Sequence, residues 1–393
     1  MLNFSYWNPT RIIFGKESIA DVGQEAAKWG KRVLFHFGGG SIKANGVYDA
    51  VTNSLKEAGL EVVYLGGVVP NPHLSLVRQG IALCKKEKID LVLAVGGGSV
   101  IDSAKAIAFG TKLQGNEDVW NDYFMRAQYD IQDALPVGVV LTIPAAGSES
   151  STASVITDEK EGLKRAINSE TVIPKFAVMD PETNYSLPNY QTACGATDIL
   201  AHLQERYFTM VGGNDLSDRL LESCMRNIIA NAPLALKNPS EYVYRAELMW
   251  TGTIAHNNLL DRGRLGDWAT HDIEHELSAL YDIAHGAGLA ILFPAWMKYV
   301  YKDNIDRFVQ YAIRVWDVSL PLEDKDSIVE EAITRLQNFY RRIGMPTSLT
   351  EVKIGKNKLR FMAEKALFGE RTHLGNFKKL YVDDVEKIYH LAL

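Results

Sequence analysis

The hydrophobic and polar positions in the first half of the chain follow two alternating patterns. Short apolar runs rich in β-branched residues are typical of buried strands. Between them, apolar residues recur every three or four positions, as on one face of a helix. The expected strands span 32–37, 61–65, 91–95, 137–143 and 176–179, and the expected helices span 48–58, 74–87 and 99–110. This alternation predicts βαβ units and a largely parallel, Rossmann-like sheet.

The helical period dominates after Asp180-Pro181, and we expect no strand between Gln191 and Leu393. The prolines at 181 and 188 break regular structure where the pattern changes. The helices expected after this break span 189–209, 215–230, 240–260, 266–281, 286–300, 305–316 and 322–343. We therefore predict an α/β domain over residues 1–185 and an all-helical domain over residues 186–393.

Composition and charge exclude several classes of protein. The chain has 393 residues, 47% of them hydrophobic, which is enough apolar material for the cores of two domains. The net charge of −6 comes from interspersed acids and bases, so we expect neither a nucleic-acid nor a membrane partner. Residues 1–15 do not resemble a signal peptide, and Cys84, Cys194 and Cys224 show no CxxC spacing. We expect a cytoplasmic protein.

Glycine-rich segments follow two of the expected strands. Gly38-Gly39-Gly40-Ser41 follows the first strand, and Gly96-Gly97-Gly98-Ser99 follows the third and leads directly into a helix. Without side chains, such a backbone can approach a pyrophosphate closely, and the N–H groups that open a helix favour an anion. Neither segment is a GxGxxG motif, and each alone fits a plain tight turn. Together they favour a dinucleotide site at the carboxyl ends of parallel strands.

The segment around the first glycine loop bears on the choice of dinucleotide. Sites that select NAD(H) tend to place a carboxylate against the ribose 2′-hydroxyl, where it would repel a 2′-phosphate. No Asp or Glu occurs between Phe37 and Tyr48, whereas Lys43 does. We therefore expect NADP(H) to be preferred over NAD(H). A third segment, 142–149, supplies small and hydroxyl-bearing residues that suit either a polar loop or contacts with the nicotinamide half.

Metal-ligand chemistry is indicated by five residues in the helical half. Asp198 and His202 are four positions apart on one expected helix, and His271 and His275 repeat this spacing on another, so each pair lies on one helix face. His285 follows at the start of the next helix. One carboxylate and three imidazoles suit Fe(II) or Zn(II). Each histidine alone also fits an ordinary core or surface position.

The spacing of His271 and His275 is also found in zinc peptidases. In those enzymes a glutamate follows the first histidine and acts as the general base. Here the residue after His271 is Asp272. This difference and the upstream glycine loops argue against a metallopeptidase.

The chain resembles the iron-containing (group III) alcohol dehydrogenases along essentially its whole length, and within them the NADP-preferring butanol dehydrogenases and aldehyde reductases. The resemblance lies in motifs that occur in a fixed order. They are residues 6–15, the loop from Gly96 to Asp102, residues 142–149, Leu187-Pro188 followed by residues 195–198, residues 267–271, His275-Glu276-Leu277 and His285-Gly286.

The resemblance implies roles for individual residues. Asp198, His202, His271 and His285 would bind the metal, and His275 would lie beside the nicotinamide and the substrate. The dinucleotide contacts that it implies are Gly38, Gly39 and Ser41 at the adenosine phosphate, Gly97, Gly98, Ser99 and Asp102 in the pyrophosphate loop, and Thr142 and Lys164 at the nicotinamide half. It also implies a dehydroquinate synthase-like architecture, a site between the two domains, and dimerisation through the N-terminal segment.

The implied activity is hydride transfer between a nicotinamide dinucleotide and a short-chain primary alcohol or its aldehyde, assisted by the metal. Alternatives on the same architecture are a glycerol dehydrogenase and a dehydroquinate synthase-like enzyme. An alternative of another class is a regulatory module that binds the nucleotide, with a structural metal. It would bind NADP without turning it over.

Overall fold

The computed structural model describes residues 1–126, 130–368 and 371–393, which form two compact units. The sheet unit comprises Trp7–Leu187 and Pro239–Asn258. The helical unit comprises Met1–Tyr6, Pro188–Asn238 and Leu259–Leu393.

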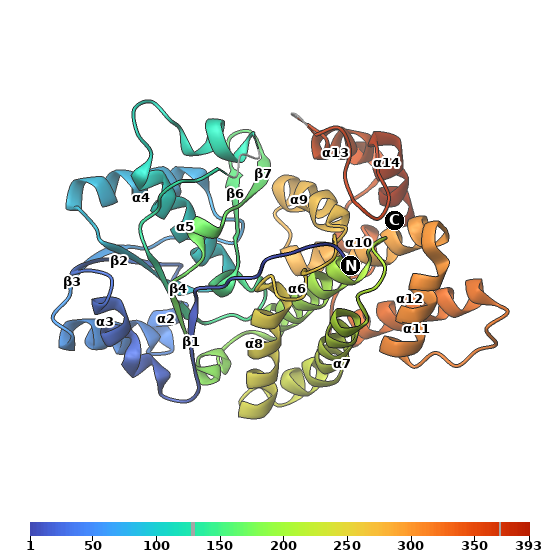
Figure 1. Ribbon diagram of the computed structural model, residues 1–393, viewed down its shortest axis with the longest axis horizontal. Helices are drawn as coiled ribbons and strands as arrows, with labels where there is room; N and C mark the ends of the chain where they lie inside the picture. The colour runs from blue at the N-terminus through green and yellow to red at the C-terminus, as the bar shows by residue number, and fades with distance from the viewer. Residues whose placement is uncertain (127–129, 369–370) are drawn as a thin grey trace. The chain divides into compact units, whose positions relative to one another are not determined.

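The sheet unit is built on a six-stranded parallel sheet with the strand order β1-β8-β5-β4-β2-β3 (Figure 1). Its strands are β1 (Arg11–Phe14), β2 (Arg32–Phe37), β3 (Glu61–Leu65), β4 (Leu91–Gly96), β5 (Val137–Leu141) and β8 (Phe176–Met179). The five strands expected from the apolar runs are all present. Chain order reverses between β2 and β4, because β3 lies outside β2 and all later strands lie on the other side. Open α/β sheets bind their ligands at such a switch point.

Two hydrophobic cores cover the two faces of this sheet, and successive side chains of a strand enter one core and then the other. On β2, Val33 and Phe35 lie in one core, which includes α1 and α3, whereas Leu34 lies in the other, which includes α4 and α5. On β4, Leu93 lies in the same core as Val33, and Ala94 lies in the same core as Leu34. Side chains alternate across a strand, so a strand covered on both faces must be apolar at every position. This explains the continuous apolar runs.

The helices of the sheet unit are α1 (Val22–Ala27), α2 (Ser41–Ala44), α3 (Val47–Glu57), α4 (Leu74–Glu87), α5 (Gly98–Lys112) and α8 (Tyr242–His256). An antiparallel hairpin of β6 (Ala153–Asp158) and β7 (Leu163–Asn168) adds to them. The sequence pattern did not predict this hairpin. Its strands carry Asp158, Lys164 and Arg165, which break the apolar run that marks the other strands.

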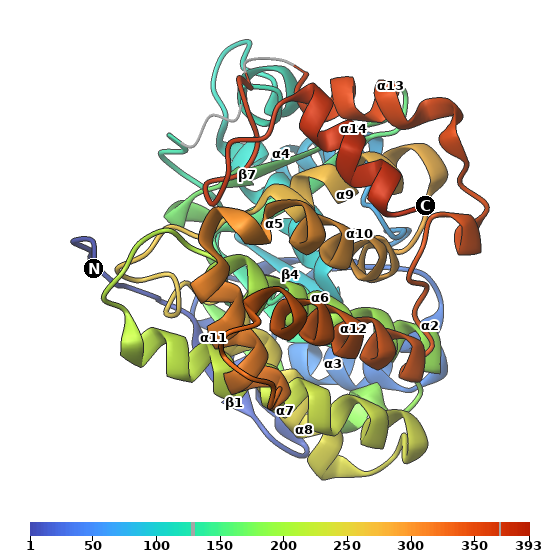
Figure 2. The same cartoon turned by 90° about the vertical axis from the view of Figure 1, so that its right-hand side faces the viewer.

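The helical unit contains no named strand among its described residues. Its helices are α6 (Asn189–Tyr207), α7 (Asp215–Lys237), α9 (Ala269–Tyr281), α10 (His285–Val300), α11 (Ile305–Trp316), α12 (Lys325–Arg342), α13 (Leu359–Ala366) and α14 (Val382–Leu391). Helix α10 is buried along almost its whole length and packs against α6, α9, α12 and α14 (Figure 2). An all-apolar helix of this kind is typical of the centre of a helical domain.

Helix α8 packs with the sheet unit although it lies in the helical half of the sequence. The Trp250 ring meets the Phe14 ring edge-on, with 6.1 Å between centroids, and Thr253 donates a 2.5 Å hydrogen bond to Glu149. Asn8 donates to the backbone carbonyl of Asn257. The division into functional domains at residues 185/186 stays a prediction, and the compact units divide the chain at different points.

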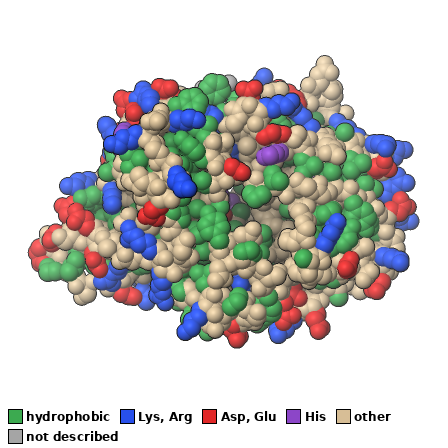
Figure 3. Space-filling model, turned by 180° about the vertical axis from the view of Figure 1, so that it is seen from behind, with side chains coloured by type: hydrophobic (Ala, Val, Ile, Leu, Met, Phe, Trp, Pro, Cys, Tyr) green, Lys and Arg blue, Asp and Glu red, His purple; other side chains and the backbone are tan. Residues whose placement is uncertain are grey.

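Charges are mixed on the face of the molecule that Figure 3 draws. On the face drawn in Figure 3, Lys and Arg side chains are interspersed with Asp and Glu side chains rather than gathered by sign. Among the described residues, no helix has both the length and the apolar character needed to span a bilayer.

Candidate functional site

Helix α6 presents Asp198 and His202 on one buried face. The helix begins after Pro188, and most of its residues from Thr192 onward are buried. Both side chains are at least nine-tenths buried, and the four-residue spacing places them one turn apart. Ordinary core positions of a helix are apolar, so a buried carboxylate beside a buried imidazole requires a compensating partner.

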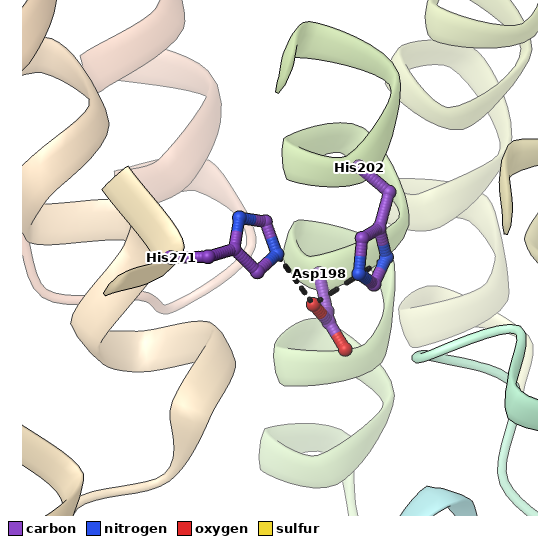
Figure 4. Close-up of side chains that lie close together, drawn as sticks. All are labelled: Asp198, His202 and His271. Carbon is purple, nitrogen blue, oxygen red and sulfur yellow. Dashed lines mark ion pairs between the residues drawn. The ribbon is translucent and has the colours of Figure 1, made fainter. Parts of the chain in front are cut away.

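His271 completes a cluster of three groups with this pair. The Oδ1 atom of Asp198 lies 3.7 Å from Nδ1 of His202 and 3.8 Å from Nε2 of His271 (Figure 4). One ligand atom from each of the three residues falls within 4.8 Å of the others. Figure 4 shows the carboxylate of α6 pointing between the two imidazoles, one from its own helix and one from α9.

The other two histidines predicted for the site, His275 and His285, lie close to this cluster. Nε2 of His285, the first residue of α10, lies 3.8 Å from the same Asp198 oxygen. The His275 ring is 5.7 Å from the His285 ring, and its side chain is buried. The geometry therefore brings together Asp198, His202, His271 and His285, with His275 beside them.

The four converging residues fit a divalent metal ion. Oδ1 of Asp198 and Nε2 of His271 are buried without a hydrogen-bond partner, which is costly unless an ion binds them. Oxygen and imidazole donors together suit Fe(II) or Zn(II). In the protein without an ion, burial lowers the pKa of His271, but the carboxylates of Asp198 and Glu205 outweigh it and raise the pKa to about 9. A cation is therefore favoured at this position.

Two buried glutamates near the cluster were not among the residues singled out in the sequence. Glu205 accepts a 2.8 Å hydrogen bond from Nδ1 of His271, and Glu274 bonds to Nδ1 of His285. Both carboxylates are fully buried. Their spacing from the histidines in the sequence gives no signal, because each glutamate lies on a different helix from the histidine that it contacts.

Backbone strain lies next to the cluster. Trp268 precedes α9 with φ 68°, in the left-handed region, and its N–H donates a 2.6 Å hydrogen bond to Glu205. Its ring centroid lies 5.3 Å from that of His271. The expected helix 266–281 therefore starts three residues late, at Ala269. A non-glycine residue in this conformation is typical of a site that the surrounding structure holds in place.

The predicted dinucleotide loops lie on neighbouring strands of the sheet unit. Gly38 and Gly39 follow β2, Ser41 is the first residue of α2, and Gly97 follows β4. Gly98 and Ser99 form the first turn of α5. The two loops therefore flank the β2/β4 switch point, and the N–H groups of α5 open toward the same edge.

Two of these glycines lie too close to neighbouring side chains to be replaced by a larger residue without a shift. A Cβ atom at Gly97 would lie 2.9 Å from Cβ of Ile143, and one at Gly98 would lie 2.9 Å from Cβ of Ala146. At Gly39 a Cβ atom would meet nothing within 4 Å. The second loop is therefore glycine-rich because of its own packing, whereas the first leaves open space at Gly39.

The other three predicted contacts occupy different surroundings. Thr142 lies directly after β5, where its N–H donates to the carbonyl of Gly96 at 3.0 Å. Lys164, on β7, donates a 3.0 Å hydrogen bond to Asn71. The Asp102 carboxylate accepts from Ser148 at 2.5 Å and from the Val155 N–H at 3.0 Å, inside the unit.

Lys105 forms the centre of a buried polar group that the motifs did not reveal. Its ammonium donates to Ser148 Oγ, to the carbonyl of Ser151 and to the carbonyl of Ala153, at 2.8–3.0 Å. Burial lowers its pKa to about 8, although the charges of Asp102 and Glu149 oppose this shift. The group ties the first turns of α5 to the segment 148–153.

Comparison with known proteins places both halves of the chain in one family. Residues 9–181 match the iron-containing alcohol dehydrogenases, and residues 192–393 match the C-terminal domain of the same family. The chain is 42% identical to a probable NADH-dependent butanol dehydrogenase 1 of Bacillus subtilis, with all of both chains covered. It is 37% identical to the NADPH-dependent aldehyde reductase YqhD of Escherichia coli, also with full coverage of both.

Solved structures agree with this assignment. An NADH-dependent butanol dehydrogenase A from Thermotoga maritima is 41% identical and has a TM-score of 0.94, with 99% of this chain and 98% of that chain covered. A crystal structure of YqhD from E. coli has a TM-score of 0.96 at 37% identity, with 100% and 99% covered. The chain therefore belongs to the iron-containing alcohol dehydrogenase family.

Proposed function

We propose that the protein interconverts short-chain primary alcohols and aldehydes, with a nicotinamide dinucleotide as hydride carrier and a divalent metal ion as cofactor. One observation carries the proposal: a buried carboxylate oxygen lies within 3.8 Å of three imidazole nitrogens in a member of this family. The relatives named as butanol dehydrogenases and as an aldehyde reductase support the substrate class. They do not favour the glycerol dehydrogenase or dehydroquinate synthase alternatives.

Asp198, His202, His271 and His285 would hold the ion, which is Fe(II) or Zn(II). Held by these residues, the ion would act as a Lewis acid toward the carbon–oxygen bond of the substrate. The protein orients the donors. The buried helices fix the Asp198 carboxylate and the three imidazoles before anything binds, so little reorganisation is needed when the substrate arrives.

The glycine loops would bind the dinucleotide, which supplies or accepts the hydride. In this proposal Gly38, Gly39 and Ser41 bind the adenosine phosphate, Gly97, Gly98 and Ser99 the pyrophosphate, and Thr142 and Lys164 the nicotinamide half. Asp102 acts indirectly, because its carboxylate holds the segment after β5 through Ser148.

We infer that NADP(H) is preferred over NAD(H). The loop after β2 has no carboxylate to repel a 2′-phosphate, and Lys43 adds a positive charge two residues after Ser41. The relatives differ in this property: those of B. subtilis are named NADH-dependent, and YqhD is named NADPH-dependent. The ratio of kcat/KM for NADPH to that for NADH tests the inference. A ratio below one would overturn it.

His275 would move the proton that accompanies hydride transfer. It follows His271 by one helical turn, its ring lies 5.7 Å from that of His285, and an imidazole can exchange a proton near neutral pH. His275→Ala should impair turnover and leave most of the metal bound. Loss of stoichiometric metal in this variant would instead make His275 a ligand.

We also propose a homodimer and a cytoplasmic location. Met1, Phe4, Tyr6 and Trp7 are all more than two-fifths exposed, which is unusual for large apolar side chains near one terminus. β1 is an edge strand of the sheet. The three cysteines are free, as is typical of a reducing compartment. Light scattering at the mass of one chain would exclude the dimer.

One experiment tests the activity. Protein stripped of metal and reloaded with Fe(II) or Zn(II) is mixed with NADPH or NADH and a panel of two-carbon to six-carbon aldehydes. Loss of absorbance from the reduced nicotinamide is the readout. We expect turnover with butanal that depends on the added metal. Binding of dinucleotide without turnover of any aldehyde would favour a regulatory module instead.

A further inference from the structure

Two buried carboxylates join three helices of the metal cluster, α6, α9 and α10. Glu205, on α6, accepts from Nδ1 of His271, on α9, at 2.8 Å. Glu274, on α9, bonds to Nδ1 of His285, on α10. Helix α6 therefore supplies the carboxylate that holds the histidine of α9, and α9 supplies the carboxylate that holds the histidine of α10. Neither glutamate is among the ligands proposed above.

We propose that Glu205 and Glu274 are positioning residues that set the affinity and the coordination geometry of the metal site. The inference rests on the proposed function only in requiring an ion at the Asp198 cluster. A carboxylate that accepts from one imidazole nitrogen fixes the tautomer, leaves the other nitrogen free to bind a metal and increases its basicity. In both histidines the nitrogen that faces Asp198 is Nε2, the one opposite the glutamate.

The surroundings of Glu205 hold its carboxylate in one place. In addition to the imidazole, it accepts from the backbone N–H of Trp268 at 2.6 Å and of His271 at 3.1 Å. These N–H groups lie at the N-terminal end of α9, at its N-cap residue and in its first turn, where the helix itself offers them no acceptor. Glu205 therefore orients the His271 ring and also anchors the backbone that carries it.

The surroundings of Glu274 are equally specific. Ser278 donates a 2.5 Å hydrogen bond to its Oε1 atom. Helix α10 approaches closely at Gly288, where a Cβ atom would lie only 2.4 Å from Oε1 and 2.6 Å from Cγ. A side chain at position 288 would therefore displace the Glu274 carboxylate and with it the His285 ring.

The test compares Glu205→Gln and Glu274→Gln with the wild-type protein. The amide can still accept a hydrogen bond but carries no charge, so the fold should persist. Affinity for Zn(II) is measured by competition with a chromophoric chelator, without any assay of activity. We expect each variant to bind Zn(II) about 10- to 100-fold more weakly. The visible spectrum of the Co(II)-loaded protein should also change, because it reports ligand geometry.

Glu276→Gln is the matched control. Glu276 is a fully buried glutamate on the same helix as Glu274, and its Oε2 atom lies 3.8 Å from Nζ of Lys365, which is not a proposed ligand. Its substitution should leave Zn(II) affinity and the Co(II) spectrum unchanged. Gly288→Ala provides an independent perturbation with every carboxylate retained, and it should weaken Zn(II) binding in the same direction as Glu274→Gln.

The outcomes separate this inference from the proposed function. If the two glutamine variants bind Zn(II) within twofold of wild type and give its Co(II) spectrum, the positioning role is excluded while the metal site stands. An equal loss in Glu276→Gln would mark a general effect of buried charge and would also overturn the proposal. If the wild-type protein itself binds no divalent ion, the metal-dependent function fails. Should a glutamine variant not fold, Ser278→Ala tests the Glu274 contact more gently.

Discussion

The metal cluster of the helical unit and the glycine loops of the sheet unit prepare for their ligands in opposite ways. In the helical unit, buried side chains converge and are held by other buried side chains, as Glu205 holds His271. In the sheet unit, the candidate site consists of backbone at glycine residues, which have no side chain, as at Gly97 and Gly98. A cation needs donors at fixed points, whereas a phosphate needs access to N–H groups. The metal site should therefore be lost when one of its side chains is removed. The glycine loops should lose their ligand when a side chain is added.

The largest effect is expected for Asp198→Ala. The substitution removes the oxygen that lies within 3.8 Å of three imidazoles, which leaves the histidines without their common partner. We expect less than a tenth of the wild-type metal content. We also expect a loss of roughly 10³-fold in kcat/KM, equivalent to about 4 kcal/mol. Metal analysis and steady-state kinetics provide the two measurements. A variant that kept both metal and rate would refute the ligand assignment.

The next effect concerns Lys105, a fully buried cation of the sheet unit. Lys105→Met should lower the free energy of unfolding by about 3 kcal/mol, because it leaves the buried Asp102 and Glu149 uncompensated. Urea denaturation measures the change. Lys112→Met is the control on the same helix, since Lys112 pairs with Asp133 at the surface. Equal effects of the two substitutions would show that the buried ammonium has no special role.

A smaller and pH-dependent effect is expected within the helical unit. Burial would raise the pKa of Asp218, but hydrogen bonds and charge from Arg307, together with Arg264, lower it to about 2. Because the folded pKa is below the unfolded value, the stabilisation is present above pH ~4 and is lost as the pH falls toward 2. Asp218→Asn should therefore cost about 2 kcal/mol at pH 7, and this difference from wild type should shrink to near zero by pH 2.

The urea midpoints of the two proteins at a series of pH values measure this difference. Asp215→Asn, at an exposed ion pair with Arg219, is the control and should change stability little at any pH. A constant difference between Asp218→Asn and wild type from pH 7 to pH 2 would contradict the prediction.

The smallest effect is expected when a methyl group is added to a glycine loop of the sheet unit. Gly97→Ala should raise the KM for the dinucleotide about tenfold, or about 1.4 kcal/mol, because the new methyl would displace Ile143 and with it the loop after β5. Metal content should not change. Gly39→Ala adds the same volume where no protein atom lies within 4 Å, so it should leave the free energy of unfolding unchanged. A KM unaffected by Gly97→Ala would argue against a phosphate at this loop.

The sequence predicted most of the fold because its local patterns and its packing agree. The run Leu91–Val95 is apolar at every position, which only a strand covered on both faces requires, and it forms β4. The β6–β7 hairpin was missed because Lys164 and Arg165 are polar but buried, and the hydrogen-bond partner of Lys164, Asn71, is distant in the sequence. Tertiary contacts, not local pattern, determine such strands.

In the candidate site too, the sequence predicted some residues and missed others. The four-residue spacing of Asp198 and His202 predicts a shared helix face, and the structure brings that pair together with His271 and His285. The supporting groups could not be found in this way. Glu205 and Glu274 lie on different helices from the histidines that they contact, so their partnership depends on how the helices pack and leaves no periodic mark in the sequence.

The position of helix α8 has a consequence for how the chain is made. The last strand of the sheet ends at Met179, but residues 239–258 belong to the same compact unit. During translation, domains fold as units once their residues have emerged. The ribosome must therefore release about 80 further residues before the sheet unit can be finished, and a gene fragment that stops at codon 185 would encode an incomplete product.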